Sequence, residues 1–370
     1  MHLSRVGSAF ALAIALAILP ALGDAQVAPR YGSVFDGSAV EKLAEGVYAF
    51  IAPNSKTPYF NGNTLVVVGD DGVLVVDSGD ALPVTRNTIA EIRRLTPLPV
   101  RFLVNTHWHW DHALGNGEYR AAFPGVTILS TTATRTLMDT KGRANLADSI
   151  AAIPPYLESL RKMLAAGVRR DGSPLAPGDR ESLQAQLDDL GRGVQCYKEA
   201  QVVLPDVTFD RELTVRLGRR AVTLLAFGPG NTLGDAVVFV PDARVAASGD
   251  LVVAPTPFAY DSAIFEWPAA MRRLMALDAA IIVPGHGPVM RDWAYARMIT
   301  ELLESIGAQV RDAVARGLSL EDTRNAVDVA ALRARIVGAD PILARNFDQF
   351  FLAPAVDAAY KEAQGSPARK

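Results

Sequence analysis

Three histidines and one aspartate fall within six consecutive positions, in the stretch His107-Trp108-His109-Trp110-Asp111-His112. The chain has five histidines in all, and the other two are His2 and His286. Imidazole and carboxylate groups together form the usual ligand set for zinc and similar metals. Histidines that cluster by chance in the core or on the surface are the alternative, but ordinary packing has no use for such a concentration of ligands. The stretch therefore predicts a metal site.

The N-terminal residues 1–25 are predicted to be an export signal that is removed from the mature chain. An apolar run from Ala9 to Leu22 precedes Gly23-Asp24-Ala25, a small-residue cleavage site. A transmembrane anchor is the alternative, but an apolar run of roughly 14 residues is shorter than the ~20 that a bilayer requires. We therefore expect a periplasmic or secreted protein with no stable membrane anchor after cleavage.

The composition narrows the choice of partners. Hydrophobic residues make up 49% of the chain, enough for a substantial core, and the formal net charge is −3. No basic run with interleaved aromatic residues is present, so we expect no nucleic-acid partner. The single cysteine, Cys196, cannot form an internal disulfide and is expected to be a buried, inert thiol. The expected partner is a small-molecule substrate, and the chain is expected to be a monomer or a homodimer.

Alternating strand and helix signals predict an α/β fold. Buried strands are predicted at 63–69 and 72–77, a helix at 83–95, and a strand at 100–105 that leads directly into the histidine stretch. Strand signals return between 207 and 247 and again at 280–283, just before Gly285-His286-Gly287. The metal ligands would thus lie on loops at strand ends, where a rigid scaffold presents chemistry.

Two regions have helical rather than strand patterns. Residues 131–204 are predicted to form a helical insertion, with one helix at 156–166 entered through Pro154-Pro155 and another that starts at Asp179 as its N-cap. The insertion is either structural cover or a wall or lid over the metal site. Residues 291–370 are predicted to form a C-terminal helical extension that packs on the main domain or forms a dimer interface. Its aromatic segment 346–352 is expected to be ordered.

Five motifs in order resemble those of the metallo-β-lactamase superfamily. They are Asp77 after its strand, the stretch 107–112, the glycine-rich loop 228–235, Asp250 after its strand, and Gly285-His286-Gly287. The resemblance implies a four-layer αβ/βα sandwich with the metal site between the sheets. The corresponding domain would cover residues 30–290, with the helical insertion inside it.

The resemblance also implies a role for each motif residue. One zinc would be held by His107, His109 and a residue of the glycine-rich loop, and a second zinc by Asp111, His112 and His286. Asp250 matches a carboxylate that bridges the two metals in many of these hydrolases. Asp77 would orient the histidine loop through hydrogen bonds. A simple turn residue is the alternative for Asp77.

One position departs from the family pattern. Where the family has a histidine in the glycine-rich loop, this chain has Asn231. A carboxamide oxygen is neutral and binds zinc less well than imidazole does. We therefore expect one tightly bound zinc at the second site and weaker binding at the first, where Asn231 is a doubtful ligand.

The resemblance implies an exported zinc-dependent hydrolase. Zinc lowers the pKa of bound water from ~15.7 towards 7, and the resulting hydroxide would attack the carbonyl of an ester, thioester, lactone or amide. Asp111 would orient the water and accept its proton. A β-lactamase acting on antibiotics is the first alternative, although such enzymes have cysteine or serine where this chain has Asp250. A metal-binding periplasmic protein without catalysis is the second alternative.

Overall fold

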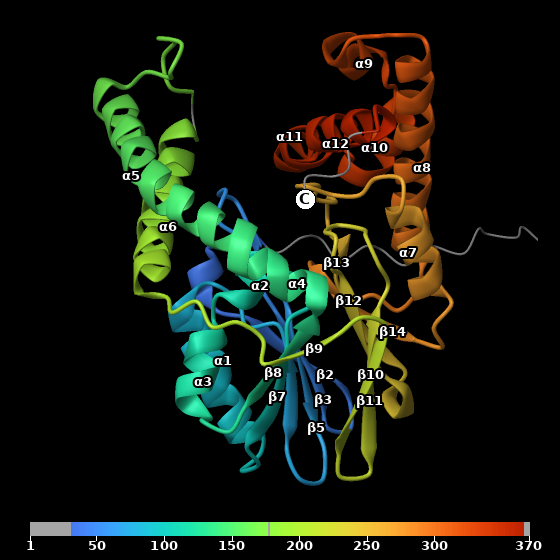
Figure 1. Ribbon diagram of the computed structural model, residues 1–370. Coiled ribbons are helices and arrows are strands. Elements are labelled where there is room, and N and C mark those ends of the chain that lie inside the picture. Colours follow the sequence, from blue (N-terminus) through green and yellow to red (C-terminus); the bar gives the residue numbers. More distant parts are fainter. Residues whose placement is uncertain (1–30, 177, 366–370) are drawn as a thin grey trace, which may run out of the picture.

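The computed structural model describes residues 31–176 and 178–365, which form an α/β sandwich (Figure 1). Two β-sheets lie face to face, and helices cover their outer faces. The predicted export signal, residues 1–25, lies outside the described residues. Within those residues, no helix is both long and apolar enough to cross a membrane.

The first sheet has seven strands in the order β2-β3-β5-β6-β7-β8-β9. Its antiparallel half precedes β6, and the strands from β6 to β9 run parallel to one another. Helices α1 (Leu82–Leu95) and α3 (Asn116–Ala122) cover its outer face, because parallel neighbours need crossover connections. The bounds of its strands are β2 Ala39–Ala44, β3 Val47–Ile51, β5 Thr64–Val68, β6 Val73–Val76, β7 Val100–Val104, β8 Thr127–Thr131 and β9 Val207–Phe209.

The second sheet has five strands in the order β10-β11-β12-β13-β14, of which only β13 and β14 are parallel neighbours. Apolar side chains such as Leu74 and Leu224 meet between the sheets and form the central core. Helices α7 (Trp267–Met275) and α8 (Ala294–Ala315) pack on the outer face. The strand bounds are β10 Glu212–Leu217, β11 Arg220–Ala226, β12 Ala236–Val240, β13 Val245–Val253 and β14 Ile281–His286.

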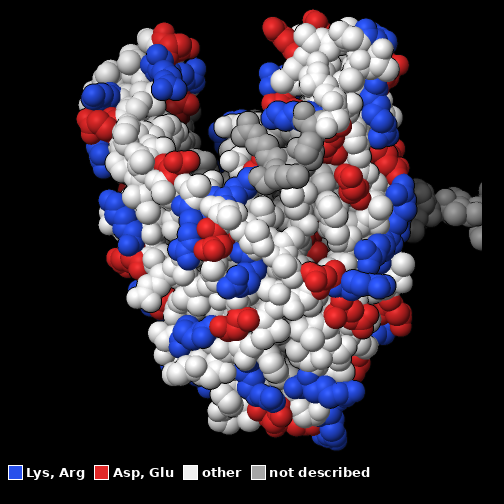
Figure 2. Space-filling view, in the orientation of Figure 1, with Lys and Arg blue, Asp and Glu red and all other residues white. Residues whose placement is uncertain are grey.

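Two helical arms rise above the same edge of the sandwich, and the surface is hollowed between them (Figures 1 and 2). One arm is the insertion and consists of α4 (Thr132–Leu137), α5 (Arg143–Ala166) and α6 (Asp179–Glu199). The other consists of α9 (Leu320–Ala326), α10 (Ala330–Val337), α11 (Pro341–Phe347) and α12 (Ala353–Ala363), which pack on α8. Positive and negative side chains are interspersed on the face shown (Figure 2).

Short elements complete the structure. A two-stranded sheet joins β1 (Tyr31–Gly32) to β4 (Asn54–Ser55), and helix α2 (Trp110–Ala113) follows the first metal-ligand candidates. Single 3₁₀ turns lie at Val34–Asp36 and Pro241–Ala243. Turns of π-helix occur at Met138–Gly142 and Asp348–Leu352. The latter lies within the aromatic segment predicted to be ordered, where Phe347 and Phe351 are fully buried.

The prediction for the first insertion helix was wrong at its start. Pro154 and Pro155 do not open a helix but lie inside α5, which begins at Arg143. A proline pair removes backbone hydrogen bonds from a helix interior. Leu157 and Leu160 are nevertheless buried against Leu190 of α6, and this packing keeps the chain helical beyond the prolines. The burial of apolar side chains between α5 and α6 thus outweighs the low helix propensity of the two prolines.

The second insertion helix was predicted nearly correctly. Asp179 is the first residue of α6 rather than its N-cap, which is Gly178 in a left-handed conformation. The Asp179 carboxylate accepts hydrogen bonds from the backbone N–H of Ala176 and from Arg169, just before the helix. Cys196, further along α6, is buried and free, as expected.

Candidate metal centre

The ligand candidates gather where strands of both sheets end beneath the two arms. Asp77 follows β6 and His107 follows β7, while His286 ends β14 and Asp250 lies within β13. Because β6 and β7 are parallel, their carboxyl ends meet at one edge of the sheet. The loop that carries Asn231 connects β11 to β12. Segments far apart in the sequence thereby converge on one site.

The first ligand cluster consists of His107, His109 and Asp250. The Nε2 atom of His107 lies 3.0 Å from Nδ1 of His109 and 3.6 Å from Oδ2 of Asp250. The three ligand atoms therefore face a common point, at separations that suit ligands of one small cation. All three side chains are buried, so this cluster has little access to solvent.

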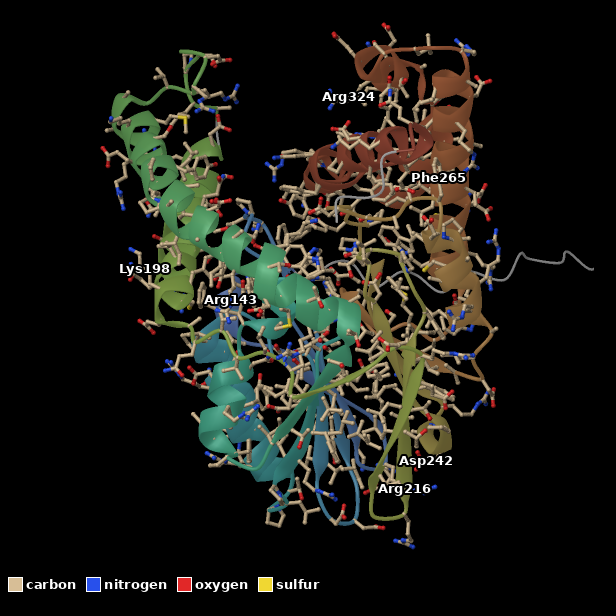
Figure 3. The ribbon with its side chains drawn as sticks, viewed as in Figure 1. Arg143, Lys198, Arg216, Asp242, Phe265 and Arg324 are labelled. Carbon is tan, nitrogen blue, oxygen red and sulfur yellow. The ribbon has the colours of Figure 1, made fainter. Side chains whose placement is uncertain are left out.

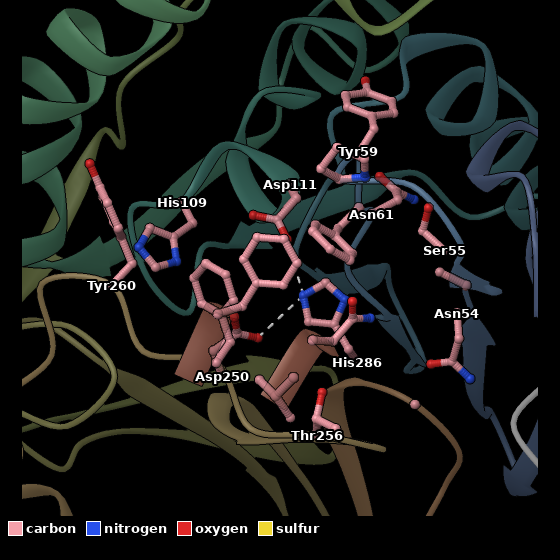
Figure 4. A pocket seen from close by; sticks show the side chains of 18 of the residues that line it. Asn54, Ser55, Tyr59, Asn61, His109, Asp111, Asp250, Thr256, Tyr260 and His286 are labelled. Carbon is pink, nitrogen blue, oxygen red and sulfur yellow. Dashed lines mark ion pairs between the residues drawn. The ribbon is translucent and has the colours of Figure 1, made fainter. Parts of the chain in front are cut away.

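The second ligand cluster consists of Asp111, His112 and His286. The Nε2 atoms of its two histidines are 3.2 Å apart. Oδ2 of Asp111 lies 3.0 Å from Nε2 of His286 and 3.4 Å from that of His112. His112 is fully buried, whereas Asp111 and His286 are partly exposed and border a cavity (Figure 4). A cation at this cluster is therefore open to a ligand from the cavity.

Asp250 connects the two clusters. Its Oδ2 faces His107, while its Oδ1 lies 3.2 Å from Nε2 of His112 and 3.6 Å from Nε2 of His286. A Cβ atom at Gly285 would come within 1.9 Å of this Oδ1, so only glycine permits the approach of β14 to the carboxylate. Each of its two oxygens thus faces one cluster, as a carboxylate shared by two metals would require, and its role as a bridging ligand stays a prediction.

Asp77 lies behind the clusters and holds the histidine loop. Its Oδ1 accepts a hydrogen bond from the backbone N–H of Thr106, and its Oδ2 accepts from the Thr106 hydroxyl and lies 2.8 Å from Nδ1 of His112. Nε2 of His112 is thereby directed to the cluster, as in other carboxylate–histidine–metal arrangements. Asp77 has a φ of 61°, a left-handed conformation that costs energy in a residue other than glycine. The contacts support an orienting role over that of a simple turn residue.

Asn231 is completely buried, and hydrogen bonds fix both its side chain and its backbone. Its Nδ2 donates a hydrogen bond to the carbonyl of Phe258 at 2.7 Å, and its backbone carbonyl accepts one from Ser262. Its Oδ1 has no hydrogen-bond partner among the described residues. A buried acceptor without a donor is costly, and a cation is one group that would remove the cost.

The protonation states of His107, His109, Asp111 and Asp250 suit a metal. Burial acts to lower the pKa of His112, but the surrounding carboxylates raise it well above the usual value, so a bound cation would displace a proton from this imidazole. Burial lowers the pKa of His107 and of His109, so both imidazoles are neutral. Burial acts to raise the pKa of Asp250 and of Asp111, but the facing histidines, above all His112, hold both pKa values well below the usual range. Metals bind neutral imidazole and ionised carboxylate, so the residues present fit a divalent cation with nitrogen and oxygen ligands.

The cavity beside the second cluster has a volume of about 300 Å³ and contains polar residues that no motif indicated. Asp80 is buried, accepts a hydrogen bond from the Tyr197 hydroxyl at 3.2 Å, and leaves Oδ1 without a partner. Burial, together with the charge of Asp111, raises the pKa of Asp80 well above its usual value. The nearby hydroxyl of Tyr59 is also buried without a partner. Only its position three residues after Asp77 could have suggested from the sequence that Asp80 lies near the metal centre.

Comparisons with known proteins agree with this geometry. Residues 57–286 match the family model described as the metallo-beta-lactamase superfamily. A metallo-beta-lactamase from Pontibacter korlensis is similar in structure, with a TM-score of 0.50 and 20% sequence identity over 72% of this chain and 99% of that one. At this identity the likeness concerns the fold alone.

Two curated relatives share parts of the sequence. A linear primary-alkylsulfatase from a Pseudomonas strain (ATCC 19151) is 25% identical over 264 residues, which are 68% of this chain and 44% of that protein. A lactamase-like protein of Penicillium aethiopicum is 32% identical over 78 residues, or 21% of this chain and 25% of that protein. The chain thus spans less than half the length of either relative.

Proposed function

Because the chain belongs to the metallo-β-lactamase superfamily, we propose that it is an exported, metal-dependent hydrolase that cleaves an ester, thioester, lactone or amide. The observation that carries the proposal is the pair of ligand clusters joined by Asp250 and open to a cavity on one side. A structural metal site would have no need of that opening, since such sites are closed by protein ligands.

His107, His109 and Asp250 would hold one metal, and Asp111, His112, Asp250 and His286 would hold the other. Zinc fits this set of nitrogen and carboxylate ligands. When bound, it supplies an activated water molecule and polarises the substrate carbonyl. Asn231 would complete the first site through its otherwise unpartnered Oδ1.

The chain's own residues would position the reactants. Asp111 is partly exposed to the cavity, so its carboxylate can hold the attacking water and accept its proton. Asp77 keeps His112 in its orientation throughout, since its carboxylate is fixed by Thr106. The buried side chains of Trp108 and Trp110 line the cavity, where they would limit the access of bulk water to the reacting groups.

Three other functions deserve a test. A β-lactamase is favoured by the structural likeness in fold, and a sulfate-ester hydrolase by the 25% identity to an alkylsulfatase. A metal-binding protein without catalysis is favoured by Asn231, which replaces imidazole with a weaker ligand. The cavity next to Asp111 supports catalysis over simple binding.

The decisive experiment is a panel of substrates offered to the zinc-loaded protein. The panel comprises 4-nitrophenyl acetate, a thioester, a lactone, nitrocefin and dodecyl sulfate, with Asp111→Asn as the control for each. We expect metal-dependent turnover of at least one carbonyl compound and a large loss in the variant. Turnover of nitrocefin or dodecyl sulfate alone would select one of the alternatives. No metal-dependent turnover of any compound would contradict the proposed activity and favour a binding protein.

Export is a separate part of the proposal. It is supported by the apolar run between Ala9 and Leu22 and the small residues that follow it. N-terminal sequencing of protein recovered from cell extracts and from the periplasm or medium would test it. We expect a mature chain that begins near Gln26, and an uncleaved chain in the cytosol would contradict export.

A further inference from the structure

The segment Phe60-Asn61-Gly62-Asn63, between β4 and β5, runs beside the second ligand cluster. Its backbone is hydrogen-bonded to the segments that carry the ligands. The N–H of Gly62 donates to the carbonyl of Asp111 at 2.9 Å, and the N–H of Asn63 donates to the carbonyl of Gly285 at 2.7 Å. Because one acceptor is a ligand candidate and the other precedes one, the segment is fixed next to the cluster.

Close packing brings Asn61 to the cluster. A Cβ atom at Gly62 would come within 2.5 Å of the His112 ring, so only glycine permits the chain to pass this close. On the other side of Asn61, the ring of Phe60 lies edge-on to that of His286, with ring centres 6.5 Å apart. Asn61 thus borders the cavity from the same side as the second cluster (Figure 4).

The carboxamide of Asn61 is fixed in one orientation. Its Oδ1 accepts a hydrogen bond from the backbone N–H of Asp80 at 3.0 Å and a longer one from that of Ala81 at 3.5 Å. Gly79 permits this approach, since a Cβ atom there would lie 2.6 Å from the same Oδ1. Two backbone donors face the oxygen, so the Nδ2 group must occupy the other branch of the amide.

The Nδ2 group of Asn61 is a donor without an acceptor. In the part of the chain that the structure describes, it makes no hydrogen bond, and the residue is only 6% exposed. The turn that orients it is supported in its own right, because the Asp80 carboxylate accepts a hydrogen bond from Tyr197 of α6. A donor held in place before a ligand arrives needs no reorganisation when charge develops near it.

We infer that Asn61 is a catalytic residue, whose Nδ2–H group donates a hydrogen bond to the carbonyl oxygen of the substrate. When the attacking oxygen bonds to the carbonyl carbon, the π electron pair moves onto the carbonyl oxygen, and it returns when the leaving group departs with the electrons of its own bond. No proton leaves Asn61, and its hydrogen bond is strongest while the oxygen is negative. The inference rests on the proposed hydrolase function and adds a residue to it.

Two substitutions of Asn61 test this role in the zinc-loaded protein. Asn61→Asp retains an oxygen that can accept from the N–H of Asp80 but replaces the donor, and Asn61→Ala removes both groups. With whichever carbonyl compound is turned over fastest, we expect kcat to fall by about 100-fold or more in both variants, since loss of one such donor costs on the order of 10²–10³ in kcat. KM should change by less than about threefold. An unchanged kcat, or a loss confined to KM, would overturn the inference.

Asn54→Ala is the matched control. Asn54 also borders the cavity, but it lies in β4, outside the segment 60–63 (Figure 4). We expect its kcat to stay within about threefold of the parent value, whatever the change in KM. Equal losses of kcat in Asn54→Ala and Asn61→Ala would assign the effect to the shape of the cavity and contradict a specific donor. Thermal melts and zinc analysis would show that the variants fold and hold the same metal.

A ketone that cannot be hydrolysed separates this inference from the proposed activity. The infrared C=O stretch of 4-nitroacetophenone, labelled with ¹³C at the carbonyl, moves to lower wavenumber when the oxygen accepts a hydrogen bond. On binding to the zinc-loaded protein we expect such a shift, at least halved in Asn61→Ala and retained in Asn54→Ala. This pattern without any ester turnover would contradict the hydrolase and leave the donor role intact. Ester turnover with no shifted band in the parent, or with equal shifts in all three proteins, would do the reverse.

Discussion

The two ligand clusters share Asp250 but differ in charge and in exposure. The first, with His107 and His109, is the more deeply buried and borders the cavity only through His109 and Asp250. The family pattern gives it Asn231, a neutral carboxamide, as its remaining ligand candidate. The second adds the carboxylate of Asp111 to two imidazoles and opens to the cavity. Since an ionised carboxylate binds a divalent cation better than an amide oxygen does, the second cluster should hold its metal more tightly.

The contrast also assigns different tasks to the two clusters. The cluster with the stronger ligands is the one that borders the cavity, where Asp111 and His286 remain partly exposed. Tight metal binding and substrate access are therefore expected to coincide at the second cluster. The first cluster borders the cavity only through the buried side chains of His109 and Asp250, so its cation would act mainly through Asp250. A metal pair of unequal strength is the expected consequence.

Loss of the shared carboxylate should have the largest effect, because it damages both clusters at once. We expect Asp250→Ala to lower kcat/KM on the order of 10³-fold or more, which corresponds to the several kcal/mol that metal-ion catalysis supplies. Metal analysis should show loss of zinc from both sites. Asp242→Ala is the surface control, as Asp242 pairs with Arg220 far from the centre (Figure 3). Full activity of the Asp250 variant would rule out a shared role.

Removing one histidine from each cluster tests the inequality directly. After dialysis we expect the parent protein to retain one zinc per chain. His109→Ala should still retain that zinc, whereas His286→Ala should lose it. Of these two histidines, only His286 belongs to the second cluster. Inductively coupled plasma mass spectrometry would count the metal. Two tightly held equivalents in the parent, or equal losses in both variants, would show that the clusters are equivalent.

Asp77→Asn should weaken the second cluster without removing a ligand. Loss of such a supporting carboxylate typically costs 10–100-fold in metal affinity or activity, and we expect a loss in that range. Asparagine tolerates the left-handed backbone of Asp77, so the fold should persist. Asp261→Asn is a matched control, since Asp261 has a similar φ of 60° but pairs with Lys141. Unchanged zinc affinity in Asp77→Asn would reduce Asp77 to a turn residue.

Much of this arrangement could be predicted because it depends on local sequence. Strands 64–68, 73–76 and 100–104 are short β-branched runs bounded by turn residues, and they lie within two residues of the predicted bounds. The order of the motifs placed Asp77, Asp250 and the four histidines 107, 109, 112 and 286 at one site, and the structure brings them together there. The division into domains and the roles of the ligands stay predictions.

Other features depend on contacts between distant segments and leave little local signal. The prolines of α5 favoured a helix start at 156, but burial of Leu157 and Leu160 against α6 decided otherwise. Phe350 was expected only to be ordered, and its approach to Phe60 requires the C-terminal arm to fold back over the first sheet. In the sequence Asp80 resembles a turn residue, and only the structure shows that it accepts a hydrogen bond from Tyr197 of the insertion.

The smallest effect, and the most informative about the buried cluster, is expected from Asn231→His. Imidazole is the better zinc ligand, so a second zinc should bind at least about tenfold more tightly, a gain of ~1.4 kcal/mol. The larger ring must fit a fully buried position and replace the hydrogen bond to Phe258, which will offset part of the gain. Isothermal titration with zinc, after the tight site is filled, would measure it. Asn231→Ala is the counterpart: if it binds the second zinc as well as the parent does, Asn231 does not contact the metal, and the inequality of the clusters must come from Asp111 alone.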